Sequence, residues 1–406
     1  MLFKDIIGQY ATKQQLCEMV QYNRLSHALL FLGKEGCGAL PLALTFAQYV
    51  SLSPHVQTAA KEATASLFGD VAEEQVIPVP STPEEADAFM EKHAAYSKAS
   101  KFVHPDIHFS YPVIPKKSGD KPKSTDYVTE WREFISQHPY GNAFDWLQFI
   151  GAENKQGNIT AEECNDIIHK LNLKSFESEY KILVMWMPEY LGKEGNKLLK
   201  LIEEPPANTL FILVAENEEQ ILPTILSRCQ LIKIPLPETA EIKEALIHRA
   251  GAAPDTALQT AAIAEGNYRE ALQLLQHSEE DWISLISDWL KFTIRSMLPE
   301  QVKWIDDISK LGREKQKQLL LYFNHLLEQG IRLRVMGNGQ AIAEKEKDFA
   351  QRINKITSVS QQQVIIEELD KATYYIERNA NGKMLFHALT IKIYHIIQDK
   401  ALFLTD

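Results

Sequence analysis

Five short, largely apolar runs stand out along the chain, and each has the length of a strand. Such runs are typical of parallel strands that are buried on both faces of a sheet. They lie at residues 29–32, 107–113, 182–187, 209–215 and 231–234. Between the third and fourth runs, apolar residues recur at helical spacing until Pro205-Pro206, which predicts a parallel βαβ unit. The pattern therefore predicts an α/β fold.

Helical spacing dominates the remainder of the pattern. Helices are expected within residues 4–25, 59–65, 84–92 and 159–171, the last with Thr160 as its N-cap. Three parts follow from these patterns. They are an α/β domain at 1–235 with an insertion at about 51–165, a small helical lid at 236–277 and an all-helical C-terminal domain at 278–406.

Composition narrows the functional classes. The chain has 406 residues, of which 45% are hydrophobic and 24% charged, as is ordinary for a globular protein with several cores. Its net charge of −11 argues against a free-standing nucleic-acid binder, which needs a basic surface. No apolar run approaches the ~20 residues that span a bilayer, and the first residues lack the apolar core of a signal peptide. A cytoplasmic protein without a membrane role is expected.

Two motifs identify a family. LLKLIEEPPANTLFIL at residues 198–213, followed by ILSRCQ at 225–230, resembles bacterial clamp-loader ATPases of the AAA+ class, most closely the delta-prime branch of the DNA polymerase III subunits. The resemblance covers about residues 1–277. It implies a P-loop NTPase-like parallel sheet, and it implies that Arg228 reaches into the ATP site of a neighbouring subunit. The alternative is that Arg228 only forms a surface salt bridge.

The segment after the first predicted strand has the shape of a phosphate-binding loop. A working loop needs glycines for its backbone, a lysine for the phosphates and a Ser or Thr hydroxyl for Mg²⁺. Here Gly33, Gly36 and Gly38 are present, but Ala39 stands at the lysine position and Leu40 at the Ser/Thr position. The sequence predicts that this site binds no cofactor through the usual chemistry.

The acidic site gives the same prediction. Hydrolysis needs carboxylates at the end of the strand 182–187 for Mg²⁺ and for the attacking water, but the resemblance puts Trp186 and Met187 there. Glu189 is the alternative, as a displaced carboxylate. In GNYREALQLL at 266–275, Arg269 stands at the family's sensor-2 position, where an active subunit would contact the γ-phosphate; here it is expected to be vestigial.

The other motifs in the predicted insertion indicate no catalytic or metal-binding role. The family often has a four-cysteine zinc module before a His-Pro-Asp sequence, but this chain has no cysteine between residues 38 and 163, so no metal is expected. His104 of His-Pro-Asp is interpreted as a turn residue. The lysine-bearing loop 116–124 is interpreted as solvated, with DNA contact as the alternative, and the aromatic residues of 127–150 as core or subunit interface.

The resemblance implies a catalytically silent subunit that supplies Arg228 in trans. Its expected partners are the tau/gamma and delta subunits of DNA polymerase III in a hetero-pentameric clamp loader, and through that complex the sliding clamp and primer-template DNA. Residues 278–406 are expected to form the collar that joins the subunits, with a generic helical bundle as the alternative. Two other functions stay open: a divergent but active AAA+ ATPase of replication or repair, and a scaffold unrelated to replication.

Overall fold

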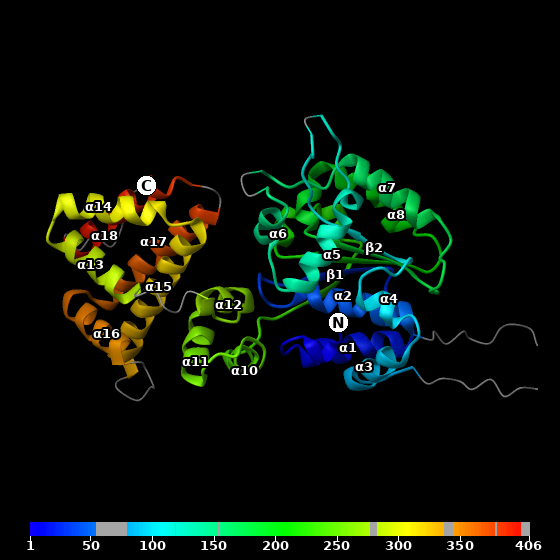
Figure 1. Ribbon diagram of the computed structural model, residues 1–406, viewed down its shortest axis with the longest axis horizontal. Coiled ribbons are helices and arrows are strands. Elements are labelled where there is room, and N and C mark those ends of the chain that lie inside the picture. The colour runs from blue at the N-terminus through cyan, green and yellow to red at the C-terminus, as the bar shows by residue number, and fades with distance from the viewer. Residues whose placement is uncertain are drawn as a thin grey trace, which may run out of the picture. The chain divides into compact units, whose positions relative to one another are not determined.

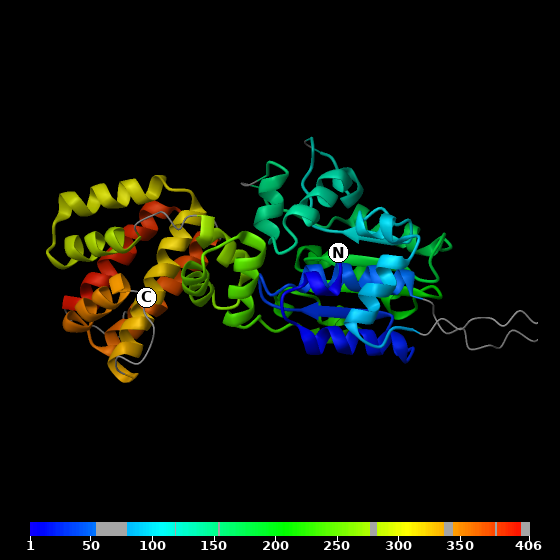
Figure 2. The same ribbon diagram turned by 60° about the horizontal axis from the view of Figure 1, so that its bottom comes forward.

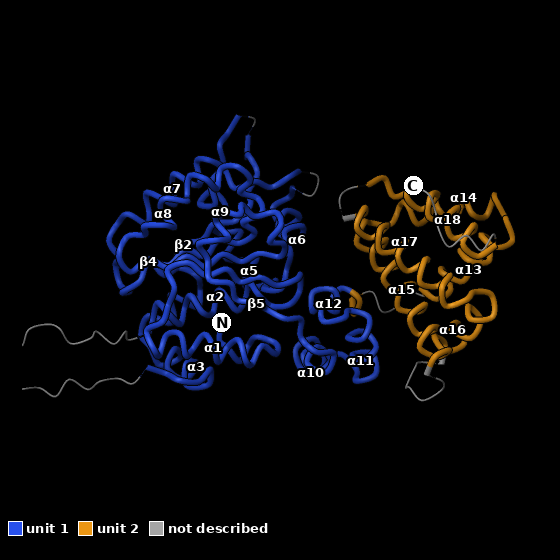
Figure 3. Tube along the Cα trace, turned by 180° about the vertical axis from the view of Figure 1, so that it is seen from behind, with its two compact units in different colours: residues 1–273 blue, residues 274–406 orange. Residues whose placement is uncertain are grey.

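A computed structural model describes residues 1–53, 79–117, 119–152, 155–276, 282–336, 344–377 and 380–398. The chain forms two compact units, residues 1–273 and residues 274–406 (Figure 3). The helix predicted at 59–65 lies outside the described residues. The three-part division into α/β domain, lid and collar stays a prediction.

Unit 1 is built on a five-stranded parallel sheet with the order β2-β3-β4-β1-β5 (Figure 1). The strands are β1 (Ala28–Leu32), β2 (Ile107–Ser110), β3 (Lys181–Trp186), β4 (Thr209–Ala215) and β5 (Gln230–Lys233). All five predicted strands are therefore present, although the second ends at Ser110, three residues earlier than predicted. The α/β class with a P-loop NTPase-like sheet and helices after it is confirmed.

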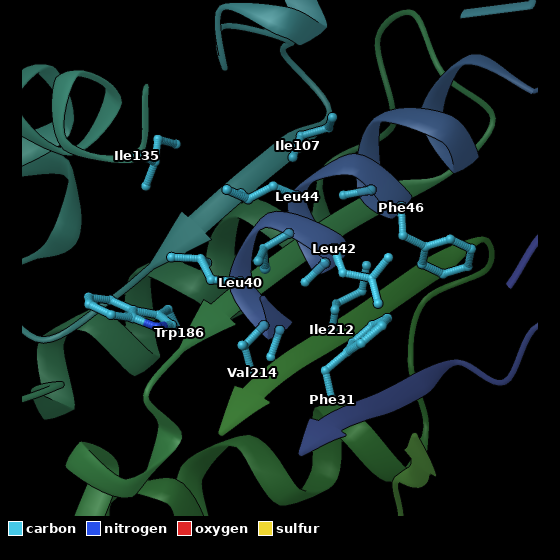
Figure 4. Packing of buried hydrophobic residues seen from close by; sticks show 14 of the residues in the cluster. Phe31, Leu40, Leu42, Leu44, Phe46, Ile107, Ile135, Trp186, Ile212 and Val214 are labelled. Atoms are coloured by element: carbon cyan, nitrogen blue, oxygen red, sulfur yellow. The ribbon is translucent and has the colours of Figure 1, made fainter. Parts of the chain in front are cut away.

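The central strands are buried on both faces, as their unbroken apolar sequences predict. Alternate residues of one face, such as Phe31 and Ile212, pack against helix α2 (Ala39–Leu52), whose Leu42 and Phe46 lie beside them (Figure 4). The opposite face packs against α7 (Ala161–Asn172) and α8 (Leu199–Glu203) (Figure 1). Because the sheet is packed on both faces, the loops at the two ends of its strands are held in fixed positions.

Unit 1 contains further helices. They are η1 (Phe3–Asp5), α1 (Tyr10–Gln21), α3 (Pro83–Lys92), α4 (Tyr96–Ser100), η2 (Ser124–Tyr127), α5 (Val128–Gln137), α6 (Ala143–Phe149), η3 (Pro188–Leu198), η4 (Glu218–Gln220), α9 (Pro223–Leu226), α10 (Thr239–Ala250), α11 (Pro254–Ile263) and α12 (Tyr268–Gln276), within which the division between the units falls. The expected α-helix between β3 and β4 is mostly η3, a 3₁₀ segment broken at Gly192 (φ 50°, ψ −138°), and only the short α8 is α-helical.

The aromatic residues of the predicted insertion form core. Tyr111 stacks on Trp131 with 4.0 Å between ring centroids, and Trp146 meets both rings edge-on. The Trp146 Nε1–H donates to the carbonyl of Pro112 at 2.6 Å, which satisfies its buried polar atom. Trp186 of β3 lies 5.2 Å from Trp131. These rings are therefore packed against each other and are not available for stacking on bases.

Unit 2 is helical throughout its described residues (Figures 1 and 2). Its helices are α13 (Trp282–Ile294), α14 (Leu298–Lys310), α15 (Arg313–Met336), α16 (Glu344–Ile356), α17 (Val359–Glu377) and α18 (Gly382–Gln398). Trp289 stacks on Trp304 at 4.7 Å and donates its Nε1–H to Thr390 Oγ1 at 2.8 Å, which joins α13, α14 and α18. Among the described residues, no helix combines the length and apolarity that crossing a membrane requires.

Candidate functional site

The predicted phosphate loop connects β1 to α2 and keeps the backbone of such a loop. Gly36 and Gly38 have φ of 72° and 92°, a region that costs other residues conformational energy. Gly33 N–H donates to the carbonyl of Ala215 at 3.1 Å, which ties the loop to β4. Ala39 and Leu40, however, are buried in the same apolar cluster as the sheet. Ala39 and Leu40, which stand at the lysine and Ser/Thr positions of a working loop, therefore contribute to the apolar core.

The space above this loop is small. A cavity of about 30 Å³ is lined by the loop, by residues 139–141, and by the ends of β3 and β4. A water molecule needs about 10–15 Å³ of such space, so the cavity has room for about two or three waters. This cavity by itself is too small to hold a nucleoside triphosphate.

The end of β3 carries no carboxylate at the positions where hydrolysis would need one. Trp186 is buried in the aromatic core, and Met187 follows it in a left-handed backbone conformation. Glu189 turns toward β4, where its Oε1 accepts the backbone N–H groups of Glu216 and Asn217 at 2.7 and 2.9 Å. Burial raises the pKa of the Glu189 carboxyl. Glu189 thus fastens two strand ends to each other.

Arg269, predicted at the sensor-2 position, lies close to the loop and is paired with protein carboxylates. Its Nη1 donates to Glu35 Oε1 at 3.0 Å, and its Nε and Nη2 donate to the two carboxylate oxygens of Asp145 at 2.5 and 2.7 Å. Only 5% of the Arg269 side chain is exposed. The structure therefore brings Arg269 close to the loop, and its guanidinium is paired there with Glu35 and Asp145.

Residues of the insertion cover the loop from the other side. The Tyr140 hydroxyl accepts the N–H of Ile7 at 2.9 Å, and its ring meets Tyr268 edge-on at 4.9 Å. Burial raises the pKa of Tyr140 to about 12. Asn142 donates from Nδ2 to Glu35 Oε2 at 2.9 Å.

Four residues of this site, Glu35, Tyr140, Asn142 and Asp145, were not predicted from the sequence. A signal was present for two of them, because Asn142 and Asp145 have the spacing of a capping box, which α6 indeed uses. For Glu35, the signal was the presence of an acidic residue inside the phosphate loop.

Arg228 lies at the opposite edge of the sheet from the loop. It follows α9 and precedes β5, whose Gln230 is level with Leu29 at the start of β1, whereas the loop follows Leu32 at the end of β1. Three further residues of strand separate these edges by about 10 Å. The guanidinium therefore does not serve this chain's own loop. One third of its side chain is exposed, and it is bonded to Glu203.

The lysine-bearing loop uses several of its charges locally. Lys116 Nζ donates to the carbonyl of Asp126 at 2.6 Å and lies 4.5 Å from the ring centre of Tyr127, and Lys123 lies 3.5 Å from Asp166. These contacts favour a folded surface loop over a DNA-binding one.

The His-Pro-Asp sequence orders a turn. Asp106 accepts the backbone N–H groups of Phe176, Glu177 and Ser178 at 2.6, 2.7 and 2.8 Å. His104 Nδ1 accepts the N–H of Asp106 at 3.2 Å. In the described part of the chain, no three His, Cys, Asp or Glu side chains gather as a metal site would require.

Comparison with known proteins finds similarity over part of the chain. Residues 84–238, which include Arg228, match the family described as "DNA polymerase III, delta subunit". The chain is 26% identical over 187 residues to the DNA polymerase III subunit gamma of Buchnera aphidicola (45% of this chain, 51% of that one). It is 28% identical over 215 residues to the DNA polymerase III subunit delta' of Haemophilus influenzae (50% and 54%). The chain thus spans about half the length of these two relatives.

Among solved structures, the chain is similar to a DNA polymerase III gamma-subunit-related protein from Thermotoga maritima. That alignment has 14% identity and a TM-score of 0.33, and it covers 96% of this chain and 99% of the other.

Proposed function

Because the chain belongs to the clamp-loader family of DNA polymerase III subunits, we propose that it is the catalytically silent, delta-prime-type subunit of a sliding-clamp loader. In this role it hydrolyses no ATP itself. It supplies Arg228 in trans to the ATP site of an adjoining motor subunit.

The position of Arg228 carries this proposal. The residue lies within the part of the chain that matches the family, and it is partly exposed at the sheet edge away from the chain's own loop. A guanidinium beside a transferring phosphoryl group stabilises the charge that develops in the transition state, and such arginine fingers accelerate GTP hydrolysis about 10³–10⁵-fold. An arginine that points away from its own site and is reachable by a neighbour suits this chemistry.

The silent character is supported at the chain's own site. A Mg²⁺–ATP site needs a lysine, a hydroxyl and a carboxylate, whereas this chain has Ala39, Leu40 and Trp186 in their places, all three buried in apolar core. The partly exposed alternative, Glu189, is held by two backbone N–H groups. No observation favours the alternative of an active ATPase.

The proposed partners are the tau/gamma and delta subunits in a hetero-pentameric loader. Unit 2, a helical body with its own core, would serve as the collar domain that joins the ring. The sliding clamp and primer-template DNA would be reached through the complex, which agrees with the net charge of −11.

Affinity purification of the tagged chain from its own cells tests the assignment. The tau/gamma and delta subunits should co-purify in fixed ratios and should remain bound after nuclease treatment. A matched preparation of residues 1–273 should lose most of these partners if unit 2 is the collar. Recovery of the full chain without any of these subunits would contradict the proposal.

A further inference from the structure

A partly buried network of side chains fills the former nucleotide site. It joins three segments that are distant in sequence: the loop after β1, the start of α6 in the insertion, and α12. Asn142 and Asn267 both donate to the Glu35 carboxylate, at 2.9 and 3.3 Å, and Arg269 bridges Glu35 to Asp145. Every link is a side chain of this chain.

The space of the site is occupied by the ring of Tyr140. Tyr140 is 7% exposed and lies between Ile7, the loop and Tyr268. Its Cε1 would be 3.1 Å from a Cβ atom at Gly38, so the ring rests directly on the loop backbone. A base or phosphate entering here would have to displace this ring and break its hydrogen bond with Ile7.

The positive charge of the site, on Arg269, is also neutralised by side chains of this chain. Arg269 carries one positive charge, and its guanidinium is already paired with two carboxylates, those of Glu35 and Asp145. An incoming phosphate would therefore lose its cationic partner and meet two anions.

The network also holds the loop, α6 and α12 together, as a bound nucleotide would. The carbonyl of Gly36 accepts the N–H of Tyr268 at 3.3 Å, and Asn267 caps α12 by accepting the N–H of Glu270 at 3.1 Å while it donates to Glu35. Asp145 belongs to the capping box of α6. The first turns of α6 and α12 are thus held to the loop by the same carboxylates.

We propose that Glu35, Tyr140 and Asp145 are a built-in replacement for nucleotide, which occludes the degenerate loop and fixes α12 to the sheet independently of ATP. This inference deepens the silent role proposed above and rests on it only in taking the loop as a former nucleotide site. It predicts that the site stays closed even when the chemistry of the loop is repaired.

Nucleotide binding by the full chain provides the first test. The variant Ala39→Lys/Leu40→Thr restores the lysine and hydroxyl but leaves the replacement in place. Neither the wild type nor this variant, checked for native circular dichroism, should bind Mg²⁺–ATP at millimolar concentration in isothermal titration calorimetry. Binding by either protein would overturn the occlusion.

Hydrogen exchange of the full chain provides the second test, which does not depend on repairing the loop. Glu35→Gln and Asp145→Asn, singly and together, remove charge with little change of shape. Because hydrogen bonds to charged groups contribute about 1.5–3 kcal/mol, the amides of α12 should exchange about ten-fold faster or more in the double variant. ATP should not slow their exchange in the wild type.

Glu91→Gln is the matched control, because it removes an exposed carboxylate of unit 1 that pairs with Lys4; α12 should exchange at the wild-type rate. Unchanged exchange in the double variant, or protection of residues 33–40 by ATP in the wild type, would overturn the proposal. Both results would leave the role of Arg228 untouched, since that role is measured on a neighbouring subunit.

Discussion

Arg228 Nε donates to Glu203 Oε1 over 2.7 Å, so the arginine of the SRC sequence is held by the first glutamate of the EEPP sequence. A second guanidinium nitrogen contacts the same oxygen, and Nη1 donates to the carbonyl of Thr224 at 2.6 Å. These contacts orient the guanidinium before any neighbour arrives. The side chains of Arg228 and Glu203 are 33% and 44% exposed, so the pair is accessible to a phosphate.

We expect Arg228→Ala to leave the chain folded, because a partly exposed ion pair contributes at most about 1 kcal/mol to stability. A clamp loader reconstituted with this variant should assemble but lose most of the clamp- and DNA-stimulated ATP turnover at the adjoining motor site. Arg228→Lys should recover little, since a point charge cannot replace the planar two-pronged guanidinium. Steady-state ATPase and clamp-loading assays measure both effects.

Glu203→Ala is the matched control for this prediction. If Arg228 acts on a neighbour's phosphate, removing Glu203 should leave most of the turnover, because the guanidinium remains. If Arg228 matters only as the partner of Glu203, the two alanine variants should lose the same activity. Equal losses, or wild-type clamp loading by Arg228→Ala, would count against the role in trans.

The isolated chain should hydrolyse ATP no faster than buffer. Ala39 and Leu40 supply neither a cation for the phosphates nor a ligand for Mg²⁺, and Trp186 supplies no carboxylate for the water. The measurement is phosphate release with Mg²⁺ over a range of protein concentrations. Turnover that rises with protein and disappears in a folded Ala39→Arg variant would show that this loop hydrolyses ATP after all.

The centre of the sheet could be predicted from the sequence because strands β1, β3 and β4 are buried on both faces. An apolar run such as β4, Thr209–Ala215, has no other stable location than the interior. The segment after β3 was harder to predict. Leu191 and Leu198 are both buried, as a helical pattern predicts, but Gly192 interrupts the backbone and leaves 3₁₀ turns in place of an α-helix. Spacing of apolar residues reports burial, and it does not separate these two helix types.

At the candidate site, the sequence alone could reveal only the missing lysine and the missing hydroxyl of the phosphate loop. Ala39 and Leu40 are read directly from the loop, since each replaces a residue type that the chemistry requires. The residues that fill the site are another matter. Glu35 and Asp145 are 110 positions apart, and only the fold brings both to Arg269. No local pattern in a single sequence encodes such a meeting.

Acid should destabilise unit 1 partly through His104. Burial lowers the pKa of this imidazole, against the opposing effect of Asp106 and Glu177. In the unfolded chain its pKa is about 6.5, so between that value and the lower folded value the unfolded state binds more protons. The free energy of unfolding should therefore fall as the pH drops below about 6.5, and His104 should contribute no pH dependence above it.

His104→Asn isolates this contribution, because the amide oxygen can still accept the N–H of Asp106. Urea unfolding at pH 7, 6 and 5 should show a smaller loss of stability for the variant than for the wild type. The other histidines are common to both proteins and cancel in the comparison. Parallel pH profiles would show that His104 does not titrate in this way.

The contact between the phosphate loop and α12 can be tested at Gly36. A Cβ atom there would lie 1.8 Å from Oδ1 of Asn267, the atom that caps α12, and the φ of 72° adds the strain of a left-handed residue. Gly251 is the matched control, since its φ is 67° and no atom lies within 4 Å of an added Cβ. Gly251→Ala should lose about 1–2 kcal/mol of unfolding free energy from backbone strain alone.

Gly36→Ala should lose about 1–3 kcal/mol more than Gly251→Ala, because overpacking and displacement of the cap add to the same strain. Denaturant unfolding followed by circular dichroism compares the two variants. Asn267→Ser in the Gly36→Ala background should recover most of the difference, since serine still caps the helix but its shorter side chain leaves room for the methyl group. If the two glycine variants are equally stable, Asn267 does not press on the loop, and the network through Glu35 cannot hold α12 as tightly as its hydrogen bonds indicate.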